Sequence, residues 1–389
     1  MYEPLPHTQN DLRPGVVELA FGEPDPTLLP VDLVESAAAE VLRELGPGAL
    51  AYGRRSGPLA LRQAIATRIA AREGREVAET GVYVTGGNSQ ALDLILTVFT
   101  VPGDLVLVET PTYDLALGTM RDHPVEIAGV ALDGGGLDVA AVEATLARLR
   151  RAGKRARLLY TIPTFHNPTG TCLEGERRAH LLALAARHDL LVVEDDVYRE
   201  LAYDEAAPQA LWASDPTAPV IRLGSFSKSL APGLRVGWAN ARPDLLARLD
   251  AAGVLDSGGG VSHFAACVVA LVLTGGGYDG HVARLRRAYA SRRDTLGDAL
   301  HAHLPAGGSF AVPAGGFFIW VELPRGVRAT ELLPLAEEHG VSFALGRRFC
   351  SDGDDRHLRL SFSLYDEERL AEGARRLGAA LRDHARRLG

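Results

Sequence analysis

One of the two lysines in this chain lies in a segment suited to covalent chemistry. Of the 41 basic residues, only Lys154 and Lys228 are lysines. Lys228 has Ser225 and Ser227 just before it and Arg235 seven residues after it. A lysine amine can lose its proton when buried and form an imine with an aldehyde, whereas arginine cannot. The two hydroxyls and the Arg235 guanidinium could hold an anion such as phosphate beside that amine.

A second candidate is the acid pair Asp195 and Asp196, which ends an apolar run. A buried carboxylate is costly unless it has a partner. Because side chains alternate along a strand, the two acids cannot both face one partner group.

Three further motifs have residue types that bind anions or polar ligands. Gly87, Asn88 and Ser89 follow a strand and open a helix, where backbone N–H groups and the helix dipole stabilise phosphate. Asn167 lies in a His-Asn-Pro-Thr-Gly turn directly after another strand. Arg359 lies on an alternating strand, and its planar guanidinium matches a carboxylate bidentately.

The elements that would position these residues alternate between short β-branched runs and longer helical periodicities. This alternation is typical of βαβ units around a mostly parallel sheet. The expected strands are 81–85, 104–108, 157–161, 190–194, 220–223 and 234–238, and the expected helices are 30–45, 89–100, 139–151, 174–188 and 243–252. After residue 280 the pattern changes to helix 282–303, strands 316–321 and 357–361, and a last helix, which indicates a smaller α+β domain.

Composition excludes several classes of protein. The 389 residues are 47% hydrophobic and 23% charged, with a net charge of −8, as expected for a soluble globular protein. The negative charge argues against nucleic acid and anionic membranes as partners. The apolar run 264–273 is far too short to span a membrane and predicts a buried helix. Three scattered cysteines and no signal-peptide pattern indicate the reducing cytoplasm, and no metal site is expected.

Taken in order along the chain, these motifs resemble those of fold-type I pyridoxal phosphate enzymes of the class I/II aminotransferase group. They are most similar to the aminoadipate and kynurenine aminotransferase branch. The resemblance implies an α/β fold with a mostly parallel mixed sheet. It also implies three parts: an N-terminal arm and helix packing with the small domain (1–45), a large cofactor-binding domain (46–275) and a small C-terminal domain (276–389).

The resemblance also assigns roles to residues. Lys228 would carry pyridoxal 5′-phosphate and move the proton, and Asp195, three residues before Tyr198, would face the pyridine nitrogen. Tyr198 and Asn167 would bind the 3′-oxygen of the cofactor. The other implied cofactor contacts are Tyr113 on the ring and Gly87, Asn88, Ser89, Ser225, Ser227, Arg235 and a neighbouring subunit's Tyr52 at the phosphate. Arg359 would bind the substrate α-carboxylate, with Gly22 and Asn167 beside it. His166 is expected to be structural, and Asp196 is expected to face solvent at the end of its strand.

The implied reaction moves the amino group of an L-amino acid to a 2-oxo acid in a homodimer with shared active sites. Two alternatives stay open. The same fold and cofactor also serve elimination, replacement, cyclisation and oxidation, and similar domains sense ligands in MocR-type regulators. About 30 residues precede the first family-like helix here, whereas those regulators carry a DNA-binding domain at that end. The chain also departs from the family pattern at Gly258–Gly260, where extra glycine could shape a loop or make room for a bulky substrate. The substrate side chain is not predicted. Arg347 and Arg348 could read an acidic one, but a solvated arginine pair is the favoured interpretation.

Overall fold

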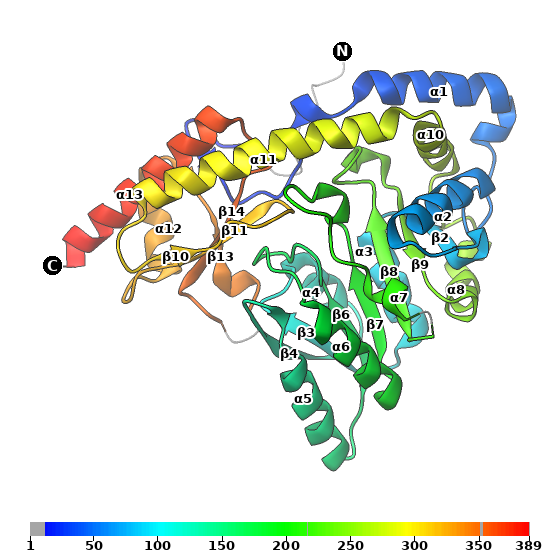
Figure 1. Cartoon of the computed structure of the whole chain (residues 1–389), viewed down its shortest axis with the longest axis horizontal. Helices are drawn as coiled ribbons and strands as arrows, with labels where there is room; N and C mark the ends of the chain where they lie inside the picture. Colours follow the sequence, from blue (N-terminus) through cyan, green and yellow to red (C-terminus); the bar gives the residue numbers. More distant parts are fainter. Residues whose placement is uncertain (1–11, 216, 351–352, 389) are drawn as a thin grey trace.

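The protein is described by a computed structural model covering residues 12–215, 217–350 and 353–388. Its centre is an eight-stranded sheet in the order β2-β9-β8-β7-β6-β3-β4-β5 (Figure 1). Strands β4, β3, β6, β7 and β8 run parallel, whereas β9 and β5 are antiparallel to their neighbours. The strand bounds are β2 Val82–Thr85, β3 Leu105–Thr110, β4 Glu126–Asp133, β5 Gly136–Leu137, β6 Ala156–Thr161, β7 Leu191–Asp195, β8 Val220–Ser225 and β9 Gly237–Asn240.

Helices cover both faces of this sheet because alternate strand residues are apolar on each face. Val192 and Val220 belong to the core under one set of helices, and Val193 and Ile221 belong to the core under the other. The first set is α1 (Val31–Leu45), α2 (Leu59–Glu73), α5 (Val139–Arg151), α6 (Gly175–His188), α7 (Leu211–Ser214) and α10 (His263–Thr274). The second set is α3 (Asn88–Phe99), α4 (Asp114–Arg121) and α8 (Pro243–Asp250). Both faces of the sheet are therefore buried under helices, as expected for a mostly parallel sheet.

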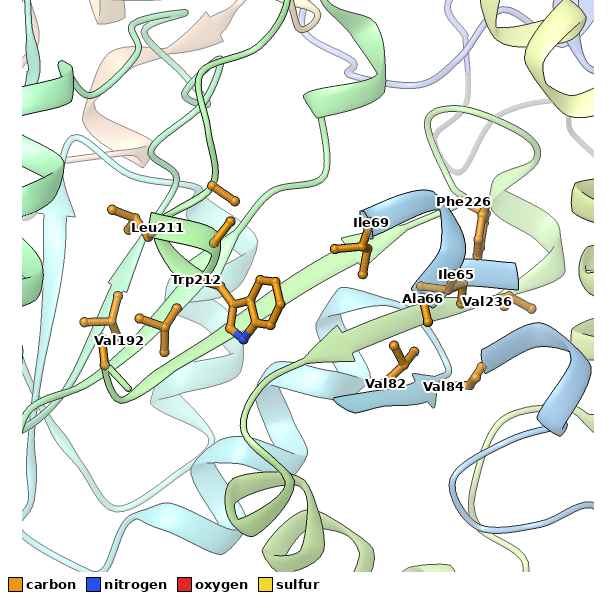
Figure 2. Close-up of a cluster of buried hydrophobic side chains, with 14 of the residues drawn as sticks. Ile65, Ala66, Ile69, Val82, Val84, Val192, Leu211, Trp212, Phe226 and Val236 are labelled. Carbon is orange, nitrogen blue, oxygen red and sulfur yellow. The ribbon is translucent and has the colours of Figure 1, made fainter. Parts of the chain in front are cut away.

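Figure 2 shows part of the first core, where α2 lies over the sheet. Ile65, Ala66 and Ile69 of α2 lie near Val82 and Val84 of β2. Phe226 and Val236, which flank the loop that carries Lys228 and Arg235, are buried in the same core. The loop with the candidate amine is thus fixed at both ends by apolar packing.

The C-terminal part is built on a four-stranded sheet in the order β10-β11-β14-β13. Its elements are α11 (Gly277–His303), β10 (Ser309–Phe310), β11 (Phe318–Glu322), α12 (Ala329–Glu338), β12 (Val341–Ser342), β13 (Ala344–Leu345), β14 (His357–Ser361) and α13 (Glu367–Leu388). The long helix α11 runs from α10 beside the large sheet to α13 beside the small one (Figure 1). In the N-terminal segment, β1 (Val17–Glu18) pairs with β12, and α1 packs along α10.

Two strand expectations differ from the structure. The expected strand 234–238 begins only at Gly237, because a 3-10 turn occupies Pro232–Leu234 and Arg235 adopts a left-handed conformation with φ of 52°. Strand β4 was not expected, because its residues are mostly partly or fully exposed and lack a buried apolar run.

Within the described residues, no single helix is long and apolar enough to cross a membrane, although α10 and α11 pass that test as a pair bent by 84°. The described part of the chain also has no group of three His, Cys, Asp or Glu side chains placed to hold a metal ion.

Candidate functional site

The amine of Lys228 lies at the junction of the N-terminal segment and the two sheets. Its Nζ donates to the Gly22 carbonyl oxygen at 2.9 Å and lies 5.7 Å from the centre of the Phe317 ring. Burial, together with the positive charges of Arg359 and Arg235, lowers the pKa of Lys228 to about 8, against the opposing effect of Glu23. A substantial fraction of the amine is therefore neutral near neutral pH, as a nucleophile requires.

Asp195 ends β7 and is held at both carboxylate oxygens. Asn88 Nδ2 donates to Oδ1 at 2.6 Å, and the Tyr160 hydroxyl donates to Oδ2 at 2.7 Å. Burial raises the pKa of Asp195 to about 6, and these two hydrogen bonds counteract that rise. Asp195 is thus a buried, oriented carboxylate that is mostly ionised at pH 7.

Asp196 points away from Asp195, as the alternation along the strand requires. It is buried in an ion cluster in which Arg222 Nη2 lies 2.8 Å from its Oδ2 and Arg199 also donates to that oxygen. These cations lower the pKa of Asp196 despite burial, which by itself raises it. The solvent-facing position expected for Asp196 is therefore wrong: its carboxylate is buried because two guanidinium groups compensate its charge.

The start of α3 and the start of β9 form a tight cradle. Gly87 has φ of 99°, and a Cβ atom there would lie 2.7 Å from Arg235 Nη2. Arg235 Nη2 donates to the Gly86 carbonyl oxygen at 3.0 Å. Ser225 Oγ lies 2.9 Å from Ser227 Oγ at the end of the neighbouring strand. Free N–H groups of the first helical turn, two hydroxyls and one guanidinium are the chemistry that binds a phosphate.

The side chains of Ser89 and Asn88, two residues expected to bind the phosphate, do not both lie in this cradle. Ser89 is exposed on the first turn of α3. The Asn88 side chain lies against Asp195 instead of extending along the cradle, and its buried Oδ1 has no hydrogen-bond partner in the described part of the chain. The sequence could not distinguish these uses of Asn88, because an amide can donate to a phosphate or to a carboxylate.

Arg359 on β14 is a buried cation next to Asn167. Its Nη1 donates to Asn167 Oδ1 at 2.8 Å and its Nη2 to the Ala20 carbonyl oxygen at 2.7 Å. The rings of Phe318 and Phe349 lie 4.0 and 4.6 Å from its guanidinium carbon. Among the described residues no carboxylate forms a salt bridge with it, and burial lowers its pKa to about 10. A buried cation without a paired anion is expensive, which points to an anionic ligand.

Phe318 joins this arginine to the segment before α1. A Cβ atom on Gly22 would lie 2.5 Å from the Phe318 ring, so only glycine fits there without displacing the ring. Tyr198 packs edge-on against Phe317 and Phe318 at centroid distances of 5.5 and 5.9 Å, and burial raises its pKa. Gly22, Lys228, Tyr198 and Arg359 therefore meet around one pair of phenylalanine rings.

Tyr113, at the start of α4, is half-buried beside this group. Burial raises its pKa to about 12, and the nearby charges of Asp114, Asp195, Arg359 and Arg235 also act on its phenol. Asp114 forms a salt bridge of 2.8 Å with Arg348, which ties the small-sheet loop to α4. Arg347 is exposed.

Tyr52 is the one expected site residue that lies apart from this cluster in the single chain. It is 91% exposed, and its ring abuts Gly258, where a Cβ atom would lie 2.8 Å from it. Gly258, the first residue of the Gly258–Gly260 segment, therefore leaves room for the Tyr52 ring.

Several residues that shape the site were not identified as site residues from the sequence. Tyr160, which binds Asp195, looks like an ordinary core residue of a buried strand. Glu109 Oε2 lies 3.1 Å from His166 Nε2 and accepts from the Ile162 N–H at 2.8 Å. His166 is thus buried behind the Asn167 turn, in agreement with the structural role expected for it.

The residues present fit a pyridine aldehyde that carries a phosphate. A buried amine with a lowered pKa suits the aldehyde, the buried Asp195 carboxylate suits the ring nitrogen, and the Gly87 cradle suits the phosphate. The unpaired Arg359 then remains for the carboxylate of a substrate.

Comparison with known proteins gives a consistent result. The family model "Aminotransferase class I and II" matches residues 14–377. The chain is 36% identical over 374 residues to aromatic-amino-acid aminotransferase 1 of Thermococcus litoralis, covering 96% of this chain and 89% of that protein. It is 39% identical over 376 residues to 2-aminoadipate transaminase of Thermus thermophilus, covering 95% of this chain and 91% of that protein. The crystal structure of kynurenine aminotransferase from Pyrococcus horikoshii superposes with a TM-score of 0.90 at 34% identity. The superposition covers 95% of this chain and 91% of that one.

Proposed function

Because this chain belongs to the class I and II aminotransferase family, we propose that Lys228, Asp195 and Arg359 carry out its amino transfer. The protein is a pyridoxal phosphate-dependent aminotransferase, which moves an amino group from an amino acid to a 2-oxo acid. The observation that supports the site assignment most strongly is the Lys228 amine, whose pKa burial lowers to about 8 beside the Arg359 guanidinium.

Bound pyridoxal phosphate supplies an aldehyde and an electron-withdrawing pyridine ring. Lys228 Nζ would hold this group at rest by bonding to its aldehyde carbon. With an amino acid in that place, the freed Lys228 amine would take the proton from the substrate Cα and hold it for return. Its pKa of about 8 is close to neutral pH, which suits both accepting and returning a proton.

Asp195 would keep a proton on the pyridine nitrogen through its buried carboxylate. Asn167 and Tyr198 would bind the 3′-oxygen, and Tyr113 would hold the ring. The phosphate would be held by backbone N–H groups of Gly87, Asn88 and Ser89 and by the side chains of Ser225, Ser227 and Arg235.

Arg359 binds the substrate α-carboxylate. Its position is fixed in advance by Asn167, the Ala20 carbonyl and the two phenylalanine rings, so little side-chain entropy is lost on binding. Gly22 lets the backbone approach the substrate closely, because a side chain there would displace Phe318. The same site holds the carboxylate of the 2-oxo acid in the second half of the reaction.

We also propose a cytoplasmic homodimer in which Tyr52 reaches the phosphate of the partner's cofactor. The high exposure of Tyr52 in the single chain supports a position facing a second subunit. Residues 1–45, 46–275 and 276–389 are proposed as the arm, the large domain and the small domain.

The test of the site assignment uses the only two lysines. Lys228→Ala is expected to abolish amino transfer and the visible absorption of the bound cofactor. Lys154→Ala is the matched control, because Lys154 is exposed and lies 3.2 Å from Glu126 on the surface. A Lys228→Ala protein that keeps both properties would contradict the assignment.

The rival elimination, replacement and oxidation chemistries are tested with the wild-type protein and an amino acid donor in the absence of a 2-oxo acid. Amino transfer predicts a stoichiometric release of 2-oxo acid with no ammonia. Sustained release of ammonia would instead favour a rival chemistry of the same cofactor.

A further inference from the structure

We propose that Tyr160 is a positioning residue that keeps Asp195 ionised and correctly aimed at the cofactor, with Asn88 holding the other oxygen. This inference rests on the proposed role of Asp195 opposite the pyridine nitrogen. It adds to that role two side chains that act on the cofactor through Asp195.

Strand register places Tyr160 and Asp195 together. Tyr160 on β6 pairs with Val193 on the parallel neighbour β7. Since side chains alternate, Asp195, two residues beyond Val193, lies on the same face as Tyr160. The Tyr160 hydroxyl therefore donates to Asp195 Oδ2 at 2.7 Å. Tyr160 itself is 1% exposed and belongs to the core under α3, α4 and α8.

Asn88 approaches the same carboxylate from the first turn of α3. Its Nδ2 donates to Oδ1 at 2.6 Å, so the two donors fix the plane of the carboxylate from two different elements. The Val197 backbone N–H also donates to this carboxylate, so three of its roughly four lone-pair sites are used and one can accept from a protonated ring nitrogen. Held in this way, Asp195 meets the cofactor without first having to reorient.

The electrostatic effect of the two donors has a definite sign. Burial disfavours the ionised form of Asp195, and the charge of the next residue, Asp196, also acts to raise its pKa. The Tyr160 and Asn88 hydrogen bonds and the Val197 backbone N–H lower that pKa, leaving it at about 6. The phenols of Tyr113 and Tyr198 face the same carboxylate and are neutral in this range. Removing a donor should thus raise the pKa of Asp195 toward 7 or above.

Tyr278 provides a matched control for the loss of a buried hydroxyl. It is 1% exposed, and its hydroxyl donates to Ser229 Oγ at 2.7 Å, the same length as the Tyr160 bond. Its acceptor is neutral, so Tyr278→Phe removes a comparable hydrogen bond without changing the charge of a carboxylate.

The experiment measures the dissociation constant of pyridoxal 5′-phosphate for the apoenzyme between about pH 5.5 and 8.5, together with the melting temperature. Wild type should lose affinity toward acid as Asp195 becomes protonated. In Tyr160→Phe the midpoint of that loss of affinity should move up by about one pH unit. The reason is that the lost hydrogen bond favours the ionised carboxylate by an energy equivalent to about one pKa unit. Ionisation of Lys228 and of the cofactor phosphate contributes equally in every variant and cancels in the comparison.

Tyr278→Phe should lower the melting temperature as Tyr160→Phe does, but should leave the midpoint unchanged. Asn88→Ala, which removes the donor on the other oxygen without opening the core, should also move the midpoint upward. If it weakens binding equally at every pH, Asn88 acts only at the phosphate and the proposed pair is wrong. An unshifted midpoint in Tyr160→Phe, or the same shift in Tyr278→Phe, would likewise overturn the inference.

Asp195→Asn separates this inference from the proposed function. It should weaken cofactor binding and remove the loss of affinity that protonation of Asp195 causes, leaving only the pH dependence due to Lys228 and the cofactor phosphate. If Asp195→Asn keeps the wild-type profile, the proposed role of Asp195 itself fails. If it changes the profile while Tyr160→Phe does not, only the inference about Tyr160 fails.

Discussion

At the scale of single residues, the site combines ionisable groups whose pKa values burial moves in useful directions. Burial favours the neutral amine of Lys228 and makes Asp195 a weaker acid. Burial also lowers the pKa of Arg359 to about 10, which still leaves the guanidinium charged at neutral pH. The three groups thus provide a nucleophile, an anion and a cation in one place.

The first prediction concerns how fast the apoenzyme takes up its cofactor. Only the neutral Lys228 amine attacks an aldehyde, and its fraction rises with pH through a pKa of about 8. The rate of covalent cofactor uptake should therefore increase from pH 7 to pH 9 with a midpoint near 8, as followed by stopped-flow absorbance. A flat profile would mean that Lys228 is not the attacking amine or that its pKa is not lowered.

The second prediction concerns Arg359→Lys. Lysine keeps the charge but loses the planar fork that matches a carboxylate bidentately. Losing one hydrogen bond between charged groups costs about 1.5–3 kcal/mol, so kcat/KM should fall roughly 10- to 100-fold. Arg347→Lys serves as a control, since Arg347 is exposed. Equal effects of the two substitutions in steady-state kinetics would argue against a carboxylate role for Arg359.

At the scale of elements, function lies in the connections at the strand ends. The β8–β9 loop carries Lys228, the β6 end carries the Asn167 turn, and the β2–α3 connection carries Gly87. Ligands in open α/β sheets bind at the carboxyl ends of the parallel strands, and these three connections meet there. Glycines in them let backbone segments approach one another, as at Gly237, where a Cβ atom would lie 2.9 Å from Gly87 Cα.

The third prediction concerns the glycine that lies between Lys228 and the phenylalanine pair. Gly22→Ala places a methyl group 2.5 Å from Phe318, which packs on Arg359. The displaced ring should disturb the arginine and raise KM for the amino acid roughly tenfold, with a smaller effect on kcat. Gly280→Ala is the control, because Gly280 lies in α11 with nothing within 4 Å of its Cβ position. Steady-state kinetics with an unchanged KM in Gly22→Ala would contradict this role.

Much of the fold could be predicted from the sequence. The run 139–151 keeps a helical spacing of apolar residues along its whole length, and the short apolar run 157–161 is typical of a buried strand. The start of β9 could not, because nothing in the local sequence marks Arg235 as left-handed. The motifs located Lys228, Asp195 and Asn167, whereas the partners of Asp195 required knowledge of the strand register. That Tyr160 shares a face with Asp195 follows only once β6 is known to pair with β7.

At the scale of the whole molecule, one chain holds nearly all of the expected cofactor contacts. Tyr52 is the exception, because it is 91% exposed beside Gly258. Placing it at the phosphate of a second subunit makes the active site a property of the proposed homodimer.

The fourth prediction tests this shared site by mixing two defective variants. Lys228→Ala lacks the amine, and Tyr52→Ala should bind cofactor weakly. A dimer with one chain of each has one site with a native Lys228 and a native Tyr52 from the partner chain. After unfolding and refolding together, the mixture should therefore be more active than the average of the two proteins refolded alone. Activity equal to that average would place Tyr52 and Lys228 in the same chain's site.

The most direct measurement of the central claim is chemical trapping of the cofactor on the wild-type protein. Reduction of the holoprotein with borohydride, followed by digestion and mass spectrometry, converts the covalent link into a stable one and locates it. The structure predicts modification of Lys228 and none of Lys154, the exposed partner of Glu126. Modification at Lys154 alone, or of neither lysine, would contradict the assignment of Lys228 as the residue that carries the cofactor.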